Sequence, residues 1–366
     1  EARRFNIKKS GRNEYRLVSK DTLSLWGDYS FGIQAFDHHH NQSNRNGFYS
    51  LKMYDNQSIF FKMVCDSFSF AESRFINASI DYAANYTSGN RILRSKKLPG
   101  NQLSFFNTDF TNGVLTFNDE QLREIVITVS DLAGNTINLR FWVKPKKPSG
   151  LVQVPEIPAA DSTILFRYNK INKFETDDLK IELPVGSLYE DLVFTYNIKT
   201  GSSGMYSDIH YLHTAEVPLH NRIKVAIKAG NLPQNLRNKA LLVRVNGDGK
   251  RSPSGGSFEN GYVAANVNIF DGYAIVIDTI APVIKPFGDN NKSRSSLKFT
   301  VSDNFSGISK YKGEVNGKWA LVEWDPKNKL MIYRFDKVAV QGTNTFTLYL
   351  EDEKGNESKY STTFTR

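Results

Sequence analysis

A short pattern that occurs twice, Asp-x-x-Gly-Asn, constrains the fold more than any other feature of this sequence. The first copy runs from Asp131 to Asn135 and the second from Asp352 to Asn356. Each copy lies between two alternating apolar runs. Gly and Asn adopt positive φ easily, and Asp accepts hydrogen bonds from backbone amides ahead of it, so the pattern predicts a hairpin. We therefore expect one β-domain to end near residue 146 and another at residue 366.

The composition favours sheet over helix throughout the chain. Aromatic residues make up 13% of the 366 residues, with 25 Gly and 12 Pro, and no window has a long helical period. Aromatic and β-branched residues between turn formers are typical of strands. The length predicts two or three domains. The expected fold class is all-β, with tandem immunoglobulin-like β-sandwich domains.

The first and last parts of the chain share their order of motifs. The runs 31–37 and 297–303 both read as strands that end at Asp, and Asn316-Gly317 predicts a type I′ hairpin. Both parts fit a small antiparallel sandwich without the Cys…Trp…Cys core of antibody domains. In the central part, a short helical turn is expected at 187–191. The expected domains are a sandwich at 1–146 with an insertion at 71–101, a Pro-rich linker at 147–159, a central sandwich at 160–279 and a C-terminal sandwich at 280–366.

The charge and the single cysteine limit the classes of partner. The formal net charge is +9, and Lys and Arg at alternate strand positions keep sheet edges soluble. Attraction to an anionic envelope surface is the alternative. The basic runs 91–97 and 144–147 sit in no nucleic-acid motif, so no nucleic acid is expected. Cys65 excludes an intramolecular disulfide and is expected to be a small buried residue. No signal peptide or transmembrane segment is visible, and Glu1 indicates a processed or partial chain.

The histidines invite a metal interpretation that their spacing does not support well. His38, His39 and His40 follow Asp37, but adjacent side chains on an extended segment point alternately, which favours a solvated loop. His210 and His213, with Asp208 nearby, would share one face of a helix, whereas a strand or irregular segment would separate them. No third ligand is evident. We therefore assign no metal ligands and expect no cofactor in this chain.

Other candidate chemistry is equally weak. There is no Gly-x-Ser-x-Gly elbow, and the Gly-rich segments 201–204 and 254–256 lack the lysine and helix of a phosphate loop. Asp248-Gly249 lacks the EF-hand pattern around it. The four tryptophans are expected mainly in cores, with stacking on sugars as the alternative: Trp26, Trp142, Trp319 and Trp324. No catalytic residue is assigned, and the ligand-binding residues are unknown.

Seven segments, taken in their order along the chain, form a pattern that is more specific than any one of them: Phe31–Asp37, Asn46–Leu51, Phe75–Tyr82, Leu98–Asn101, Leu183–Asp191, Val217–His220 and Asp278–Pro282. Together they resemble the region that follows the catalytic domain in M23-family (lysostaphin/LytM-like) metallopeptidases of Bacteroidota. The resemblance covers nearly the whole chain. The family's zinc site uses a His-x-x-x-Asp and a His-x-His motif. This chain contains only the His-x-His of 38–40, without a preceding His-x-x-x-Asp, so no catalytic residue carries over.

The resemblance implies a non-catalytic β-domain region of a cell-envelope M23-type zinc endopeptidase acting on peptidoglycan. The region would serve positioning or interaction, and zinc is expected only in a peptidase domain absent from this chain. The expected location is the cell envelope, periplasmic, outer-membrane-associated or exported, with peptidoglycan or an envelope protein as partner. The alternative is a stand-alone periplasmic or surface scaffold that docks into an envelope complex. A third hypothesis is a carbohydrate-binding module that uses Trp26 or Trp324.

Overall fold

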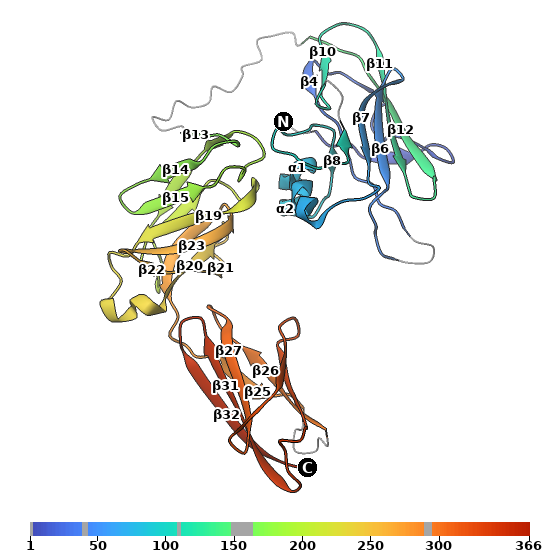
Figure 1. Cartoon of the computed structure of the whole chain (residues 1–366). Coiled ribbons are helices and arrows are strands. Elements are labelled where there is room, and N and C mark those ends of the chain that lie inside the picture. Colours follow the sequence, from blue (N-terminus) through green and yellow to red (C-terminus); the bar gives the residue numbers. More distant parts are fainter. Residues whose placement is uncertain (1–2, 39–42, 108–110, 148–163, 289–294) are drawn as a thin grey trace.

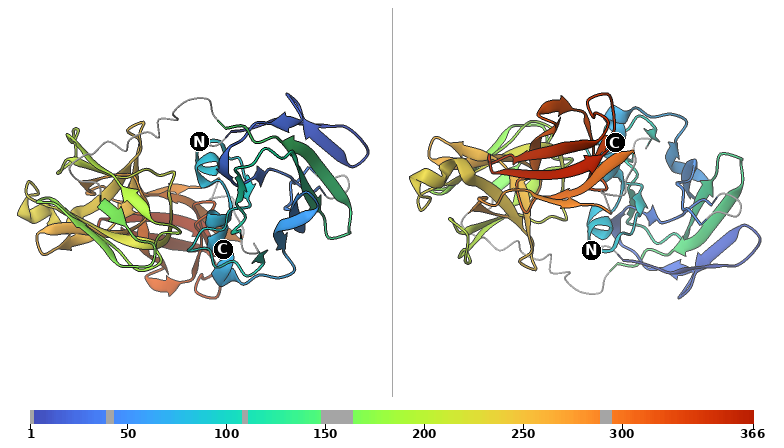
Figure 2. Two further views of the ribbon diagram at one scale, coloured as in Figure 1. Left: turned by 90° about the horizontal axis from the view of Figure 1, so that it is seen from above. Right: turned by 90° about the horizontal axis from the view of Figure 1, so that it is seen from below.

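Three β modules follow one another along the chain (Figure 1). The computed structural model describes residues 3–38, 43–107, 111–147, 164–288 and 295–366. The first module lies beside the second with short helices between them, and the third continues from the second and carries the C-terminus (Figures 1 and 2). The predicted all-β class with tandem domains is confirmed. The expected linker at 147–159 lies outside the described residues from position 148 onward.

The first module is built, among its described residues, on an eight-stranded sheet of order β1-β2-β12-β11-β6-β7-β9, with β3 beside β12. Two-stranded sheets β10-β4 and β5-β8 pack on its core. The strands are β1 (Ile7–Lys9), β2 (Glu14–Leu17), β3 (Thr22–Leu23), β4 (Gly27–Tyr29), β5 (Gly32–Ile33), β6 (Ser50–Asp55), β7 (Ser58–Val64), β8 (Leu93–Arg94), β9 (Phe106–Asn107), β10 (Leu115–Phe117), β11 (Arg123–Ser130) and β12 (Thr136–Val143).

Two details of this module differ from a plain antiparallel sandwich. Strands β2 and β3 pair with β12 in parallel. The strand expected over 31–37 is also shorter, because only the two residues of β5 find a partner, in β8. Asp37 forms an isolated bridge with Asn46 instead. The segment therefore runs along the rim of the core, which Phe31 and Ile33 contact, rather than within a sheet.

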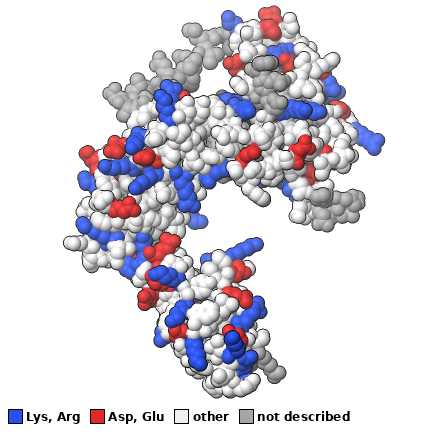
Figure 3. Space-filling model, in the orientation of Figure 1, with Lys and Arg blue, Asp and Glu red and all other residues white. Residues whose placement is uncertain are grey.

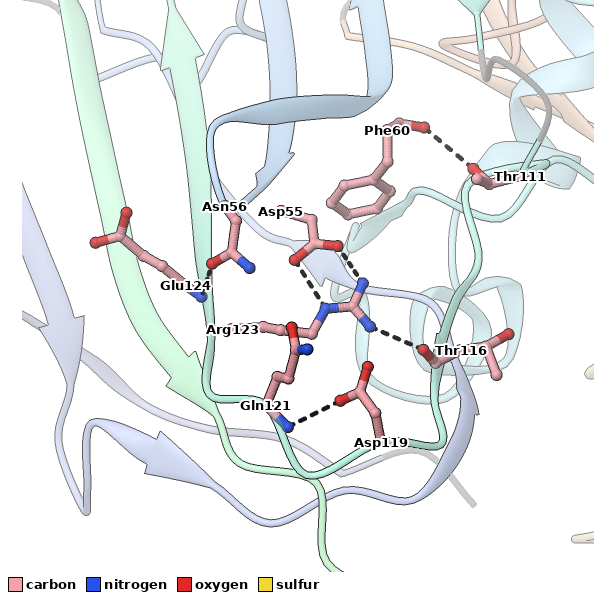
Figure 4. A network of polar contacts seen from close by, with 9 residues as sticks. All are labelled: Asp55, Asn56, Phe60, Thr111, Thr116, Asp119, Gln121, Arg123 and Glu124. Atoms are coloured by element: carbon pink, nitrogen blue, oxygen red, sulfur yellow. Dashed lines mark hydrogen bonds and ion pairs between the residues drawn. The ribbon is translucent and has the colours of Figure 1, made fainter.

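A polar network fixes the loop before β11 to the turn between β6 and β7 (Figure 4). The Arg123 guanidinium donates to both carboxylate oxygens of Asp55 and, over 2.8 Å, to the carbonyl of Thr116. It also lies 4.5 Å from the centroid of the Phe117 ring. The Asp55 hydrogen bonds raise the pKa of Arg123. Only 14% of the Arg123 side chain and 17% of the Asp55 side chain are exposed, so the pair is shielded from solvent.

Replacing Arg123 with methionine should therefore destabilise the first module by about 3 kcal/mol, because Asp55 is left as a partly buried, unpaired charge. The exposed pair Arg334–Glu323 supplies the control, since an exposed ion pair contributes about 0–1 kcal/mol. Chemical denaturation of both variants measures the difference. Equal losses for Arg123→Met and Arg334→Met would contradict a structural role for this network.

The segment 71–101, expected as an insertion of unspecified structure, contains the helices of the first module. These are η1 (Phe70–Phe75), α1 (Ile76–Ser79) and α2 (Tyr82–Ser88). The Asp81 carboxylate caps α2 by accepting from the amide of Ala84 over 3.1 Å, and Gly89 ends it with φ of 69°. Helices this short are marginal alone, so packing against the second module stabilises them.

The second module is a sandwich of two five-stranded sheets, β14-β15-β19-β23-β22 and β17-β18-β24-β20-β21, with β13-β16 at one end, over its described residues. Side chains from both sheets form one core. The elements are β13 (Ile164–Phe166), β14 (Asn172–Glu175), β15 (Leu179–Leu183), β16 (Leu192–Phe194), β17 (Tyr196–Lys199), β18 (Ile209–Leu212), β19 (Pro218–Lys228), η2 (Gln234–Lys239), β20 (Ala240–Val245), β21 (Arg251–Gly255), β22 (Ser257–Glu259), β23 (Tyr262–Ile269) and β24 (Gly272–Ile277).

The prediction of a helical turn at 187–191 is wrong. The segment forms non-helical turns, because Leu188 and Tyr189 enter two different apolar clusters. Leu188 belongs to the core of the second module, whereas Tyr189 belongs to a cluster shared with the first module. A helical turn would not direct these neighbouring side chains to opposite sides in this way.

The third module packs two four-stranded sheets, β25-β26-β30-β29 and β28-β27-β31-β32, within the part of the chain that the structure describes. The predicted type I′ turn is confirmed, since Asn316 and Gly317 have φ of 51° and 75°. The strands are β25 (Val283–Pro286), β26 (Ser296–Ser302), β27 (Ile308–Val315), β28 (Lys318–Ala320), β29 (Val322–Asp325), β30 (Leu330–Arg334), β31 (Thr343–Asp352) and β32 (Glu357–Thr365).

Both copies of the Asp-x-x-Gly-Asn pattern form the predicted hairpins, between β11 and β12 and between β31 and β32. In the first copy the Asn135 amide donates to Asp131 over 2.8 Å, and in the second the Asn356 amide donates to Asp352 over 2.8 Å. The first copy is exposed, whereas Asp352 is 1% exposed. The same local motif therefore lies on the surface in one module and inside a junction in the other.

Candidate functional site

The first junction joins the helical segment of the first module to the second module around Tyr189. This side chain is 3% exposed and packs with Phe75, Ala78 and Leu98. Its hydroxyl donates to the carbonyl of Arg74 over 2.8 Å and lies 3.0 Å from Nδ1 of His220. Because the hydroxyl has one proton, Nδ1 of His220 is the donor in the second contact. Burial raises the pKa of Tyr189, so it stays a neutral donor.

Backbone contacts bring the two modules close together at this junction. The Gly100 amide donates to the carbonyl of Tyr189 over 2.7 Å, and the Arg74 guanidinium donates to the carbonyl of Leu219 over 3.1 and 3.3 Å. The Phe75 ring stacks on His220 with centroids 4.2 Å apart. The interface thus combines apolar packing with hydrogen bonds between the two modules. These hydrogen bonds satisfy its buried polar groups, as is normal in proteins.

Gly100 is required by the closeness of this contact. A Cβ at this position would lie 2.9 Å from Cα and 3.0 Å from the carbonyl oxygen of Tyr189, and backbone atoms cannot move aside as a side chain does. We expect Gly100→Ala to destabilise the junction by about 2 kcal/mol. Gly47→Ala is the control, because nothing lies within 4 Å of its Cβ. Calorimetry should show the first two modules unfolding at a lower temperature only in Gly100→Ala.

The second junction joins the second and third modules through a cluster of carboxylates and ammonium groups. Asp278, at the end of the second module, accepts from the amide of Ser306 over 2.9 Å. The Lys239 ammonium donates to the carbonyl of Lys354 and to Oδ1 of Asn356, both over 2.7 Å. The Lys354 ammonium donates back to the carbonyl of Gly256 over 2.5 Å. Each module therefore extends a lysine into the other.

Asp278, Asp303 and Asp352 offer carboxylate oxygens within 4.8 Å of one another, a separation that suits a divalent cation. Backbone amides already donate to all three carboxylates, while Oδ1 of Asp303 has no hydrogen-bond partner in the described structure. Burial lowers the pKa of Lys354, and the carboxylates of Glu353, Asp278 and Asp352 raise it. The cluster thus joins the two modules with compensating charges, and among the described residues these three are the group that could hold a metal.

Sequence reasoning missed this cluster because its members are widely separated, at 278, 303 and 352. A signal was present, since each Asp ends a strand or follows one closely and precedes a turn. Nothing in the sequence alone brings the three turns together. They meet because β24 ends at the second junction, and the loops after β26 and β31 both lie at the end of the third module that forms this junction.

The histidine candidates lie apart from this cluster. His38 is exposed, and His39 and His40 lie outside the described residues. His210 is in strand β18 rather than on a helix, and its Nδ1 bonds the Tyr196 hydroxyl over 2.7 Å. Nδ1 of His213 bonds the Thr195 hydroxyl over 3.0 Å. The helix that would place both imidazoles on one face is therefore not what the sequence forms here.

Burial lowers the pKa of His210, His213 and His220, and the charge of Arg74 lowers that of His220 further. The unfolded chain therefore binds protons that the folded chain rejects, because its histidines titrate near pH 6.5. The contribution of these histidines to stability is fully present above that pH. It is lost as the pH falls through their lower pKa values in the folded chain. Thermal unfolding between neutral pH and about pH 5 should show this decline, and His210→Gln should make it shallower. A thermal unfolding midpoint that does not change over this pH range would contradict the expected decline.

The remaining candidates are placed as follows. Cys65, which follows the last residue of β7, is half-buried rather than buried, and burial raises the pKa of its thiol. Trp324 packs against the third core, as expected, whereas Trp319 is 64% exposed rather than part of a core. Acidic and basic side chains are interspersed over the visible face of all three modules (Figure 3), which agrees with charge that serves solubility. No helix among the described residues is long and apolar enough to cross a membrane.

Comparison with known proteins finds distant structural likenesses for the whole chain and a family match for the central module. No curated protein matches the chain. The fibronectin(III)-like modules of Clostridium thermocellum CbhA are 7% identical, with a TM-score of 0.20 over 95% of this chain and 90% of theirs. The Bacteroides ovatus mixed-linkage glucan utilization locus protein SGBP-B, solved with a mixed-linkage heptasaccharide, is 8% identical, with a TM-score of 0.17 over 100% of this chain and 68% of its own.

These scores are too low to support an argument about function or about the arrangement of modules. A bacterial ice-binding adhesin is similarly distant, at 8% identity and a TM-score of 0.15 over 93% of this chain and 90% of its own. The family comparison is more specific but covers less than half of the chain. Residues 163–278, which correspond to the second module, match the Zu5-like domain family.

Proposed function

We propose that this chain is the non-catalytic β region of a cell-envelope M23-type endopeptidase acting on peptidoglycan, and that it positions the catalytic domain. One observation carries the proposal: five of the seven segments that resemble such enzymes meet at the junctions. Phe75–Tyr82 and Leu98–Asn101 contact Leu183–Asp191 and Val217–His220 at the first junction. Asp278–Pro282 forms the second. The resemblance therefore lies in the contacts that fix one module against the next, as a positioning device requires.

Peptidoglycan hydrolysis tests the proposal directly. This chain, incubated with zinc and purified peptidoglycan, should release no peptides. The longer natural polypeptide, carrying a His-x-x-x-Asp and a His-x-His motif ahead of these modules, should release them. Release by this chain alone would refute the non-catalytic assignment. A natural polypeptide without those motifs would favour the alternative, a stand-alone periplasmic or surface scaffold.

A positioning role predicts that large and small substrates respond differently to a disturbed junction. Disturbing the first junction in the longer polypeptide, for example with Gly100→Ala, should slow cleavage of intact peptidoglycan. Cleavage of a short soluble peptide should not change, because a small substrate reaches the active site without being positioned. Gly47→Ala should leave both rates unchanged. Equal slowing on both substrates would indicate general misfolding and would contradict positioning.

A further inference from the structure

A cleft of about 190 Å³ opens at the first junction and is lined by both modules. The first module contributes Tyr82, Arg94 and Leu98, and the second contributes Tyr189, Glu216 and Val217. A cavity of this size admits a molecule of a few heavy atoms up to a dipeptide, since benzene already fills an engineered cavity of about 150 Å³. The cleft combines an apolar wall with charged groups of both signs, which is the usual composition of a small-molecule site.

Arg94 is the unusual member of this lining. Its guanidinium makes no hydrogen bond or ion pair with any residue that the structure describes, and its Nε is buried without an acceptor. The carboxylates of Asp81 and Glu190 attract it without bonding it. Asp81 instead caps α2, and Glu190 pairs with Lys96 over 3.2 Å. A partly buried guanidinium whose Nε has no acceptor is costly, so an acceptor from outside the chain would relieve that cost.

The charges around Arg94 select the kind of acceptor. A guanidinium matches a planar carboxylate in a two-point contact. An isolated anion would be repelled by the nearby Asp81 and Glu190, whereas a molecule that also carries an ammonium group would be attracted by them. Glu216, also on the lining, is exposed and makes no ion pair with a described residue, so it is free to face such an ammonium. Leu98 and Val217 offer contact to an apolar side chain.

We propose that this cleft binds a small zwitterion, an amino acid or a dipeptide with free termini, with its carboxylate on Arg94 and its ammonium toward the acidic side chains. The inference goes beyond the proposed function, because binding needs no attached peptidase. Its failure would leave the hydrolysis test above unaffected. The ligand would contact both modules and would therefore also stabilise the first junction.

Isothermal titration calorimetry with the whole chain tests the proposal. The probes are L-Ala-L-Ala and D-Ala-D-Ala, each compared with its N-acetylated and C-amidated forms, and inorganic phosphate. At least one of the two dipeptides should bind, and loss of either of its terminal charges should weaken binding at least about tenfold. Phosphate should bind more weakly than the dipeptide. No binding by either dipeptide at millimolar concentration, or phosphate binding as tightly, would overturn the proposal.

Substitutions separate the site from general effects. Arg94→Gln should abolish dipeptide binding, and Arg94→Lys should weaken it, because lysine lacks the planar two-point contact. Arg91→Gln, at an exposed position just before β8, should leave binding unchanged. Arg94→Gln should not lower the unfolding temperature, because it removes a partly buried charge that has no partner among the described residues. Binding that survives Arg94→Gln, or a variant that unfolds because Arg94 is structural, would contradict the assignment.

Discussion

Asp352→Ala should lower the free energy of unfolding of the third module by about 4 kcal/mol. Asp352 is 1% exposed and accepts from the amides of Lys354 and Asn356, each over 2.8 Å, and from Nδ2 of Asn356 over 2.7 Å. Alanine leaves these donors buried without acceptors. It also removes one of the carboxylates whose charge raises the pKa of Lys354. Denaturant unfolding followed by the signal of the third module measures the loss.

Asp131→Ala is the matched control, because it removes the same residue from the same motif in the first module. Asp131 makes equivalent contacts with Asn135, over 2.8 and 2.6 Å, but on the surface. Water can replace those hydrogen bonds, so we expect a loss of about 1 kcal/mol. If the two substitutions cost the same, the hairpin motif acts alone and the junction adds nothing to the stability of the third module.

Tyr189→Ala should uncouple the first two modules at a cost of about 3 kcal/mol. The substitution empties the centre of the cluster with Phe75, Ala78 and Leu98. It also removes the hydroxyl that bonds the Arg74 carbonyl and His220. The helical segment depends on this contact, so it should lose order as well. Calorimetry should resolve two unfolding transitions in the variant where the unaltered chain shows them coupled.

Two further variants define the source of this effect. Tyr189→Phe keeps the ring and removes only the hydroxyl, and should cost about 1 kcal/mol. Tyr311→Ala replaces a tyrosine that is 43% exposed in the third module and should leave the first two modules coupled. Persistent coupling in Tyr189→Ala would show that the hydrogen bonds from the Gly100 amide and the Arg74 guanidinium are sufficient to hold the modules together.

The hairpins could be predicted from sequence because their signals are local. Asp-x-x-Gly-Asn and Asn316-Gly317 set φ and the capping hydrogen bonds within a few residues, and the structure has the expected turns. The helices of 70–88 could not be predicted in this way. The longest, α2, has seven residues, which is too short to show a period, and a helix of this length is marginal without packing.

The junctions were hidden for a different reason. Asp278, Asp303 and Asp352 lie far apart in sequence, and Arg94 meets Tyr189 and Glu216 only after two modules have packed. Pattern reasoning concentrated on the histidines, which are adjacent or nearly so, yet His210 and His213 form separate hydrogen bonds. The segments named for their resemblance proved more informative, since several of them form the junctions.

The central claim is that two junctions hold three modules as one body. Distance measurement between spin labels by pulsed electron paramagnetic resonance tests this claim most directly. With Cys65 replaced by serine, labels at the exposed positions Asn13, Lys173 and Lys318, taken in pairs, report the distances between modules. We predict a narrow distance distribution for each pair, which broadens between the first two modules in Tyr189→Ala and between the last two in Asp352→Ala. Broad distributions in the unaltered chain, unchanged by either substitution, would contradict the account.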